Sequence, residues 1–162
     1  MTEKDAMLRL SALCSQAEHC TYEMKEKMQR WDIPDDAQDR IVEYLVSHKF
    51  VDDERFARYF VIDKIRYNKW GRRKVEQALW AKHIDDDIKT AVLDEINDDE
   101  YVKVLRPLLQ SKSRSIKASS DYERRMKLIR FAMGRGFTMD IINRCLDVDD
   151  DSVTADENLF SY

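Results

Sequence analysis

A short pattern recurs three times along the chain and divides it into modules of about 50 residues. Each copy has a large apolar residue, two spacers, an aspartate and a small or apolar residue, and the copies begin at Ile33, Ile84 and Phe137, 51 and 53 residues apart. Apolar or small residues also recur nine and five positions before each copy and eight after it: Met24, Val75 and Leu128; Met28, Leu79 and Ala132; Ile41, Val92 and Cys145. This agreement indicates a true repeat.

Each module is expected to contain three short helices. Glycine and proline number only 3 and 2 in 162 residues, so turns and sheets are poorly supplied while helix-forming residues are abundant. Three short helices cannot bury enough apolar surface alone, so neighbouring modules must share a core. The sequence therefore predicts an all-α fold, with three tandem three-helix repeats at 1–49, 50–97 and 98–147 in an elongated, curved array.

The sequence also predicts the surroundings of several single side chains. Thr21 is expected to cap the second helix, and Trp80 to pack between helices. In the last repeat, Met133 is expected to turn inward and Arg124 to remain solvated. Residues 148–162 are acidic and lack a core face, which predicts a disordered tail.

Cysteine usage and hydropathy bear on the environment of the chain. Its three cysteines, Cys14, Cys20 and Cys145, cannot all pair with one another and have no C-x-x-C spacing, which disfavours a secreted disulfide scaffold and favours the cytosol. The N-terminus is too charged for a signal peptide, and no run approaches the roughly 18 apolar residues that cross a bilayer. No membrane partner is expected.

The motifs of common enzymes are missing from the sequence. It has no P-loop, no G-x-G-x-x-G and no nucleophile elbow, and its histidines, His19, His48 and His83, are scattered. Adjacent acids such as Asp52 and Asp53 stand at a predicted helix start, where capping is a better interpretation than cation binding. We therefore expect neither an enzyme nor a cofactor or metal site.

The segment from Phe50 to Leu79 contains an amphipathic helix. Phe56, Phe60 and Val61 recur at the spacing of one buried helix face. The opposite face carries cations and one exposed apolar residue: Arg55, Arg58, Ile62, Arg66 and Lys69.

The five residues after that helix reverse the usual order of charge. Trp70 and Gly71 precede Arg72, Arg73 and Lys74, and these three cations open the next helix. A cation in the first turn opposes the helix dipole by a few tenths to about 1 kcal/mol. Because the three cations do not stabilise their own helix, their position favours a role in binding an anionic partner. The alternative is that they are simply solvated surface side chains. Trp70 is a candidate for stacking on that partner.

Two functions fit this distribution of charge. The net charge is -4, but cations gather at 64–82 and 103–135, and screening lets a local basic surface act on its own. One hypothesis is a modulator that binds a nucleoprotein surface, and the other is a DNA-binding array of helix-turn-helix-like trios. A groove reader needs cationic and amide side chains, whereas Asp35, Asp36 and Asp86 lie in the third helices of the first two trios. Sequence-specific reading is disfavoured, and weak contact with single-stranded DNA stays possible.

The central segment resembles a known family. The runs DDERFARYFVIDKIR and WGRRKVEQAL, followed by KHI, look like the central motif of the RecX family, regulators of the bacterial recombinase RecA. MKLIRFAMGRGF resembles the closing helix and Arg-Gly-aromatic turn of the same family. The resemblance extends over roughly Leu8 to Leu146. One departure is Trp31-Asp32, where the later repeats have Lys82-His83 and Arg135-Gly136.

The resemblance implies three tandem three-helix repeats and a cytoplasmic, monomeric regulator. It implies binding in the groove of the RecA filament on DNA and inhibition of recombinase and coprotease activity, within DNA repair and the SOS response. The alternative is a non-sequence-specific DNA-binding repeat protein. The candidates for partner contact are Arg55, Arg58, Arg66, Lys69, Trp70, Arg72, Arg73 and Lys74, followed by Arg124, Arg125, Arg130 and Arg135.

Overall fold

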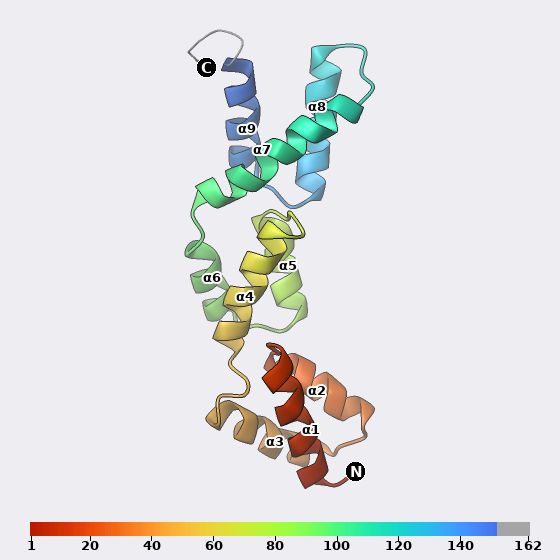
Figure 1. Cartoon of the computed structure of the whole chain (residues 1–162), viewed down its shortest axis with the longest axis vertical. Helices are drawn as coiled ribbons and strands as arrows, with labels where there is room; N and C mark the ends of the chain where they lie inside the picture. Colours follow the sequence, from red (N-terminus) through yellow and green to blue (C-terminus); the bar gives the residue numbers. More distant parts are fainter. Residues whose placement is uncertain (152–162) are drawn as a thin grey trace. The chain divides into compact units, whose positions relative to one another are not determined.

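The computed structural model describes residues 1–151, with side chains through Asp147. Within these residues every regular element is an α-helix, as the sequence predicts (Figure 1). The helices are α1 (Glu3–Gln16), α2 (Thr21–Arg30), α3 (Asp35–Ser47), α4 (Asp53–Arg66), α5 (Arg72–Ala81), α6 (Asp86–Asp94), α7 (Asp98–Ser115), α8 (Asp121–Gly134) and α9 (Met139–Asp151).

The recurring apolar positions form the core. The apolar and small residues nine and five positions before each copy and eight after it are all buried, and so are the three residues that begin the copies. The last position of the pattern is buried in Ala37 and Ile141 but only half-buried in Ile88. In the first repeat, α1 and α2 pack on α3, and Leu10 belongs to the core between them. In the third, α7 packs on both α8 and α9. The predicted repeat is therefore confirmed, because the apolar positions that recur around each copy are buried in all three repeats.

A left-handed turn explains why each copy begins with a large apolar residue. Asp32, His83 and Gly136 have positive φ angles of 57°, 57° and 93°, each just after the second helix of its repeat. The next N–H donates back into the helix at 3.0–3.2 Å: Ile33 to Met28, Ile84 to Leu79 and Phe137 to Ala132. This is the Schellman arrangement, in which the residue after the left-handed position packs against the helix it has just left.

The backbone divides into two compact units. The first contains Met1–Val61 with Ala78–Val92, and the second contains Ile62–Gln77 with the described residues from Leu93 onward. The division passes through α4 and α5, so each unit combines parts of different repeats. The repeat boundaries after residues 49, 97 and 147 stay predictions, as does the elongated, curved arrangement of the array.

Four expectations about single side chains are wrong. Thr21 does not cap α2, because Cys20 is the N-cap residue and Thr21 begins the helix. Trp80 is 71% exposed and does not pack between helices, and Met133 is 47% exposed. Arg124 is half-buried, and its guanidinium donates to the Ser113 carbonyl in the last turn of α7 and to the Ile116 carbonyl at the cap of that helix.

The C-terminal segment differs in part from the expected tail. Helix α9 continues to Asp151, four residues past the point where the apolar pattern ends. The rest of the predicted disordered tail, residues 152–162, lies outside the described residues.

Candidate functional site

The start of α5 packs against the turn that follows α8. The Gly71 N–H donates to the Arg135 carbonyl at 2.8 Å, and the Arg73 N–H donates to the Gly136 carbonyl at 3.0 Å. Carbonyls at a helix C-terminus carry the negative end of the dipole, and the first N–H groups of a helix carry the positive end. The reversed charge order at the start of α5 is therefore offset within the protein, and it does not by itself require an anionic partner.

Two glycines make this contact possible. A Cβ on Gly71 would lie 2.4 Å from the backbone N and Cα of Phe137. A Cβ on Gly136 would lie 2.5 Å from the backbone N of Lys74, at a residue whose φ of +93° already disfavours a side chain. The two backbones thus touch where any larger residue would separate them.

The three cations at the start of α5 have different surroundings. Arg72 pairs with Asp94 at 2.7 Å and also donates to the Leu93 carbonyl at 3.4 Å. The Lys74 ammonium lies over the Trp70 ring, 4.9 Å from its centroid. Arg73 is exposed, and its side chain has no hydrogen bond or ion pair with any residue that the structure describes. Arg73 is therefore the cation that is most available to a partner.

Trp70 already has cationic neighbours. It is half-buried, and besides Lys74 the ammonium of Lys64 lies 5.5 Å from the ring centroid. Cations over an aromatic face are attracted by its quadrupole. The ring organises the basic side chains around it, and the predicted stacking of Trp70 on a partner stays a prediction. No sequence pattern marks Lys64 as a neighbour of Trp70, because a separation of six residues does not place two side chains on the same side of a helix.

Most cations of α4 are held by carboxylates. In the first unit, Arg55 pairs with Glu18 at 2.8 Å and Arg58 pairs with Glu54 at 2.8 Å. In the second unit, Arg66 lies 3.8 Å from a Glu100 oxygen. Because each pair is partly exposed, it contributes little stability, yet a partner must compete with it for the arginine.

Lys69 is more available than the arginines of α4. It is exposed in the turn after α4, with a positive φ of 58°. Among the residues that the structure describes, its ammonium donates only to the Arg66 carbonyl, at 3.3 Å.

The candidates of the third repeat divide in the same way. Arg124 donates to the Ser113 and Ile116 carbonyls at the end of α7, and Arg125 pairs with Asp147 of α9 at 3.3 Å. Arg130 is exposed and has no polar partner among the described side chains. Arg135 donates to the Asn68 carbonyl at 2.9 Å, and its guanidinium lies 5.4 Å from the centroid of the Phe131 ring. Of these four, Arg135 is brought to the start of α5.

The candidate site is accordingly a compact set of cations in the second unit. We call it the turn cluster and define it as Lys64, Lys69, Arg73, Lys74 and Arg135. Lys64 comes from the end of α4, Lys69 from the turn after it, and Arg73 and Lys74 from the start of α5. Arg135 comes from the turn after α8, and the two glycine contacts hold that turn against the start of α5.

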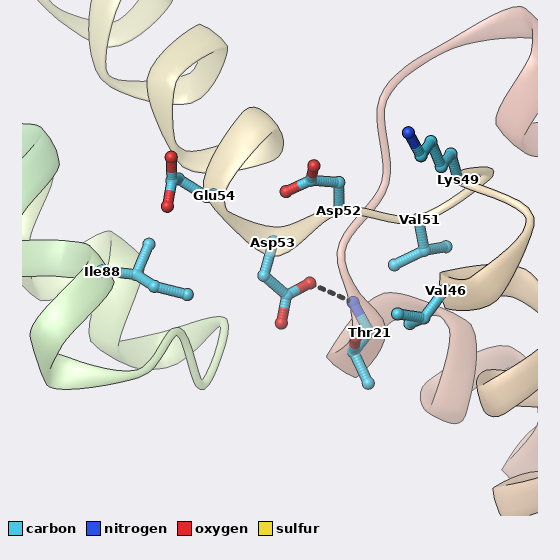
Figure 2. Close-up of a pocket in the computed structure, with 8 residues that line it drawn as sticks. All are labelled: Thr21, Val46, Lys49, Val51, Asp52, Asp53, Glu54 and Ile88. Carbon is cyan, nitrogen blue, oxygen red and sulfur yellow. Dashed lines mark hydrogen bonds between the residues drawn. The ribbon is translucent and has the colours of Figure 1, made fainter.

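A separate cavity of about 530 Å³ lies in the first unit. Figure 2 shows Ile88 on one side of it and Val46 on the other, with carboxylates of the α4 start between them. Asp53 accepts a hydrogen bond from the Thr21 N–H at 2.8 Å, so it satisfies the first turn of α2 (Figure 2). Asp52 accepts from the Arg55 N–H at 3.0 Å and caps α4. The capping interpretation is confirmed for Asp52, whereas Asp53 accepts from the start of α2 and not from its own helix.

The described residues also bear on metal binding and on membrane insertion. Among them, no group of three or more His, Cys, Asp and Glu side chains is placed to hold a metal ion. In the same part of the chain, no helix combines the length and the apolar character needed to cross a membrane.

Two family models match the chain. The model of the second three-helix domain of RecX matches residues 52–93, and the model of the third matches residues 98–146. The turn cluster takes its residues from both ranges.

Curated relatives agree with these matches. The chain is 25% identical to the regulatory protein RecX of Leuconostoc mesenteroides over 140 residues, 83% of this chain and 52% of the relative. It is 29% identical to the regulatory protein RecX of Chlorobium limicola over 136 residues, 83% of this chain and 82% of the relative. The chain spans about half the length of several curated relatives that it matches.

Solved structures show the same fold. The crystal structure of RecX from Lactobacillus salivarius superposes with a TM-score of 0.84 at 20% identity, covering 91% of this chain and 96% of that one. A second crystal structure of a regulatory protein RecX gives a TM-score of 0.82 at 18% identity, covering 90% and 73%. The two matched domain models together span more than half of the sequence, and the chain belongs to the RecX family.

Proposed function

We propose that this protein regulates the RecA recombinase by binding the RecA–DNA filament and inhibiting its recombinase and coprotease activities. The observation that carries the proposal is the match to two successive RecX domains, which include the turn cluster. The curated relatives are named regulatory proteins, which supports a regulatory role. Contact with the RecA–DNA filament is our proposal and is not part of the name of these relatives.

The turn cluster is our proposed contact surface. Arg73 and Lys69 are exposed and have no carboxylate partner among the described residues, so binding an anionic surface breaks no internal ion pair. Arg55, Arg58 and Arg72, by contrast, must first release Glu18, Glu54 and Asp94. The turn is also held rigid by its backbone hydrogen bonds, which lowers the entropy lost on binding.

Groove reading of DNA has less support. The third helices of the first two repeats, α3 and α6, begin with Asp35-Asp36 and Asp86-Asp87. Carboxylates at the start of a helix repel the phosphates that flank a groove. Direct binding to DNA is therefore the alternative that the following experiment distinguishes.

The experiment adds the purified protein to RecA on single-stranded DNA and follows ATP hydrolysis and strand exchange. We expect both to fall with the wild-type protein, and we expect Arg73→Glu to need about tenfold more protein for the same inhibition, because a charge reversal at a contact surface weakens association. Arg30→Glu is the matched control. Arg30 is an exposed arginine of α2, outside the turn cluster. It should inhibit like the wild type.

A different result would contradict the proposed regulation of RecA. If RecA is unaffected while the protein shifts naked DNA and competes with unrelated single-strand binding proteins, the chain is a DNA-binding protein and the proposal is wrong. The proposal further includes action as a monomer in the cytosol during the SOS response, and light scattering of the purified protein tests the monomer.

A further inference from the structure

The structure contains two junctions between successive repeats, and they are built alike. In the first, the start of α2 contacts the turn after α5: the Cys20 thiol lies 3.9 Å from the Lys82 carbonyl, and the Tyr22 ring stacks on His83 with centroids 4.1 Å apart. Burial in this junction raises the pKa of the Cys20 thiol to about 11. Cys20 and Tyr22 thus come from the start of the second helix of the first repeat. Lys82 and His83 are the two residues just before Ile84, where the second copy of the pattern begins.

The second junction joins the corresponding positions. Counting from the pattern, Gly71 corresponds to Cys20 and Arg73 to Tyr22, while Arg135 corresponds to Lys82. The Gly71 N–H donates to the Arg135 carbonyl, so the same carbonyl position is used as in the first junction. The two junctions can therefore be compared position by position.

An ion pair closes the first junction. Glu23 accepts from the Lys82 ammonium at 2.9 Å, and the two side chains are 21% and 33% exposed. Burial raises the pKa of Glu23, but the hydrogen bond and charge of Lys82, with hydrogen bonds from Cys20 and His19, outweigh burial and leave that pKa below its usual value. The carboxylate is charged and belongs to the structure of the junction.

The second junction lacks that carboxylate. The position of Glu23 is occupied by Lys74 and the position of Lys82 by Arg135, so two cations stand where the first junction has an ion pair. The backbone of Lys74 packs directly against Gly136, so that a Cβ on Gly136 would lie 2.5 Å from the Lys74 backbone N. Neither Lys74 nor Arg135 has a carboxylate partner among the described residues. The Lys74 ammonium lies over the Trp70 ring, and the Arg135 guanidinium lies over the Phe131 ring and donates to the neutral Asn68 carbonyl at 2.9 Å. Two like charges in this place favour an anion from outside the chain.

We propose that Lys74 and Arg135 together bind a carboxylate of a protein partner, which enters the place that Glu23 fills in the first junction. The inference rests on the proposed function and specifies its chemistry: an aspartate or glutamate of the filament protein. A carboxylate is favoured over a DNA phosphate because the group it replaces is a carboxylate. Single-stranded DNA also stacks its bases on open aromatic rings, whereas Trp70 is half-buried with ammonium groups over its ring.

The decisive variant is Lys74→Glu. It supplies the missing carboxylate from within the chain, so it should pair with Arg135 as Glu23 pairs with Lys82, and a carboxylate in the first turn of α5 also suits the helix dipole. The thermal midpoint should equal or exceed that of the wild type. Binding to RecA filaments on single-stranded DNA should nevertheless fall by about tenfold or more, because the site is filled and the charge reversed.

The matched control is the mirror variant, Glu23→Lys. It places two cations in the first junction, so its thermal midpoint should fall while its binding to filaments, measured well below that midpoint, stays near the wild-type value. A variant that binds poorly only because it is unfolded would show both losses together. The pair of variants therefore separates binding from stability.

Each remaining outcome has one meaning. If the wild type binds filaments and Lys74→Glu binds them equally well, the carboxylate site is wrong while the proposed function stands. If Lys74→Glu is less stable than the wild type, the correspondence between the junctions is wrong. If Lys74→Glu loses affinity for naked single-stranded DNA by the same factor, the anion is a phosphate and the carboxylate is refuted. If the wild type binds no filament, the proposed function fails, and this inference with it.

Discussion

Replacing Gly71 with alanine should separate the start of α5 from the turn after α8. The added methyl would lie 2.4 Å from the backbone N and Cα of Phe137 and 2.5 Å from the Gly136 carbonyl carbon. These are backbone atoms in a turn held by its own hydrogen bonds, so they cannot rotate away as a flexible side chain would. The contact must open, and the two hydrogen bonds across it, from the Gly71 and Arg73 N–H groups, are lost or stretched.

The cost follows from those contacts. Two hydrogen bonds contribute about 1 kcal/mol each, and forcing a methyl into a packed contact costs about 1–3 kcal/mol. The total is about 3–5 kcal/mol, and its lower end already lowers the thermal midpoint of a chain of this size by about 6–12 °C. Gly134→Ala is the matched control, because a Cβ there meets nothing within 4 Å. Alanine in a helix is favoured over glycine by up to about 1 kcal/mol, so the control should be unchanged or slightly more stable.

Circular dichroism at 222 nm against temperature measures both variants. The reasoning is refuted if Gly71→Ala melts within about 2 °C of the wild type, which is less than about 1 kcal/mol for a chain of this size. It is also refuted if the control melts as early as Gly71→Ala, because the loss then reflects glycine content and not this contact.

Two further predictions concern residues away from the junctions. Trp80→Ala should change the free energy of unfolding by less than about 0.5 kcal/mol, since the ring is 71% exposed; a larger loss in urea unfolding would mean that Trp80 is buried. Hydrogen bonds from the Ser119 N–H and hydroxyl, together with Lys127, lower the pKa of Glu123 to about 2 from its usual 4.5. The stabilisation is therefore complete above about pH 4.5 and disappears as the pH falls toward 2. An NMR titration should place the midpoint there, and Ser119→Ala should raise it; a midpoint near 4.5 in the wild type contradicts the hydrogen bonds.

The core was predictable because it depends on local spacing. Residues at fixed distances from Ile33, Ile84 and Phe137 lie on the inward faces of short helices, and periodicity reports that directly. The exposure of Trp80 had a signal too. It follows Leu79 by one residue, about 100° around the helix, and so lies off the stripe that Val75 and Leu79 define. The position of the ring on the helix, and not its size, decides its exposure.

The candidate site was less predictable because it depends on contacts between residues far apart in sequence. The charges at the start of α5 suggested an outside anion, whereas the offsetting carbonyl of Arg135 is 64 residues further along. The carboxylate of Asp94 that holds Arg72 is 22 residues away, on another helix. Spacing within one helix does not report either contact. The basic turn itself was recognised, but the availability of Arg73 over Arg72 required the three-dimensional structure.

The central claim is that the chain recognises a filament of recombinase on DNA, and one binding comparison tests it most directly. Fluorescence anisotropy of the labelled protein is measured against one single-stranded DNA, naked and coated with RecA, at physiological salt. The account predicts that the coated strand binds at least about tenfold more tightly, since protein contacts add to any weak, salt-screened attraction to DNA. Equal affinity for the two strands, or binding to the naked strand alone, would contradict it.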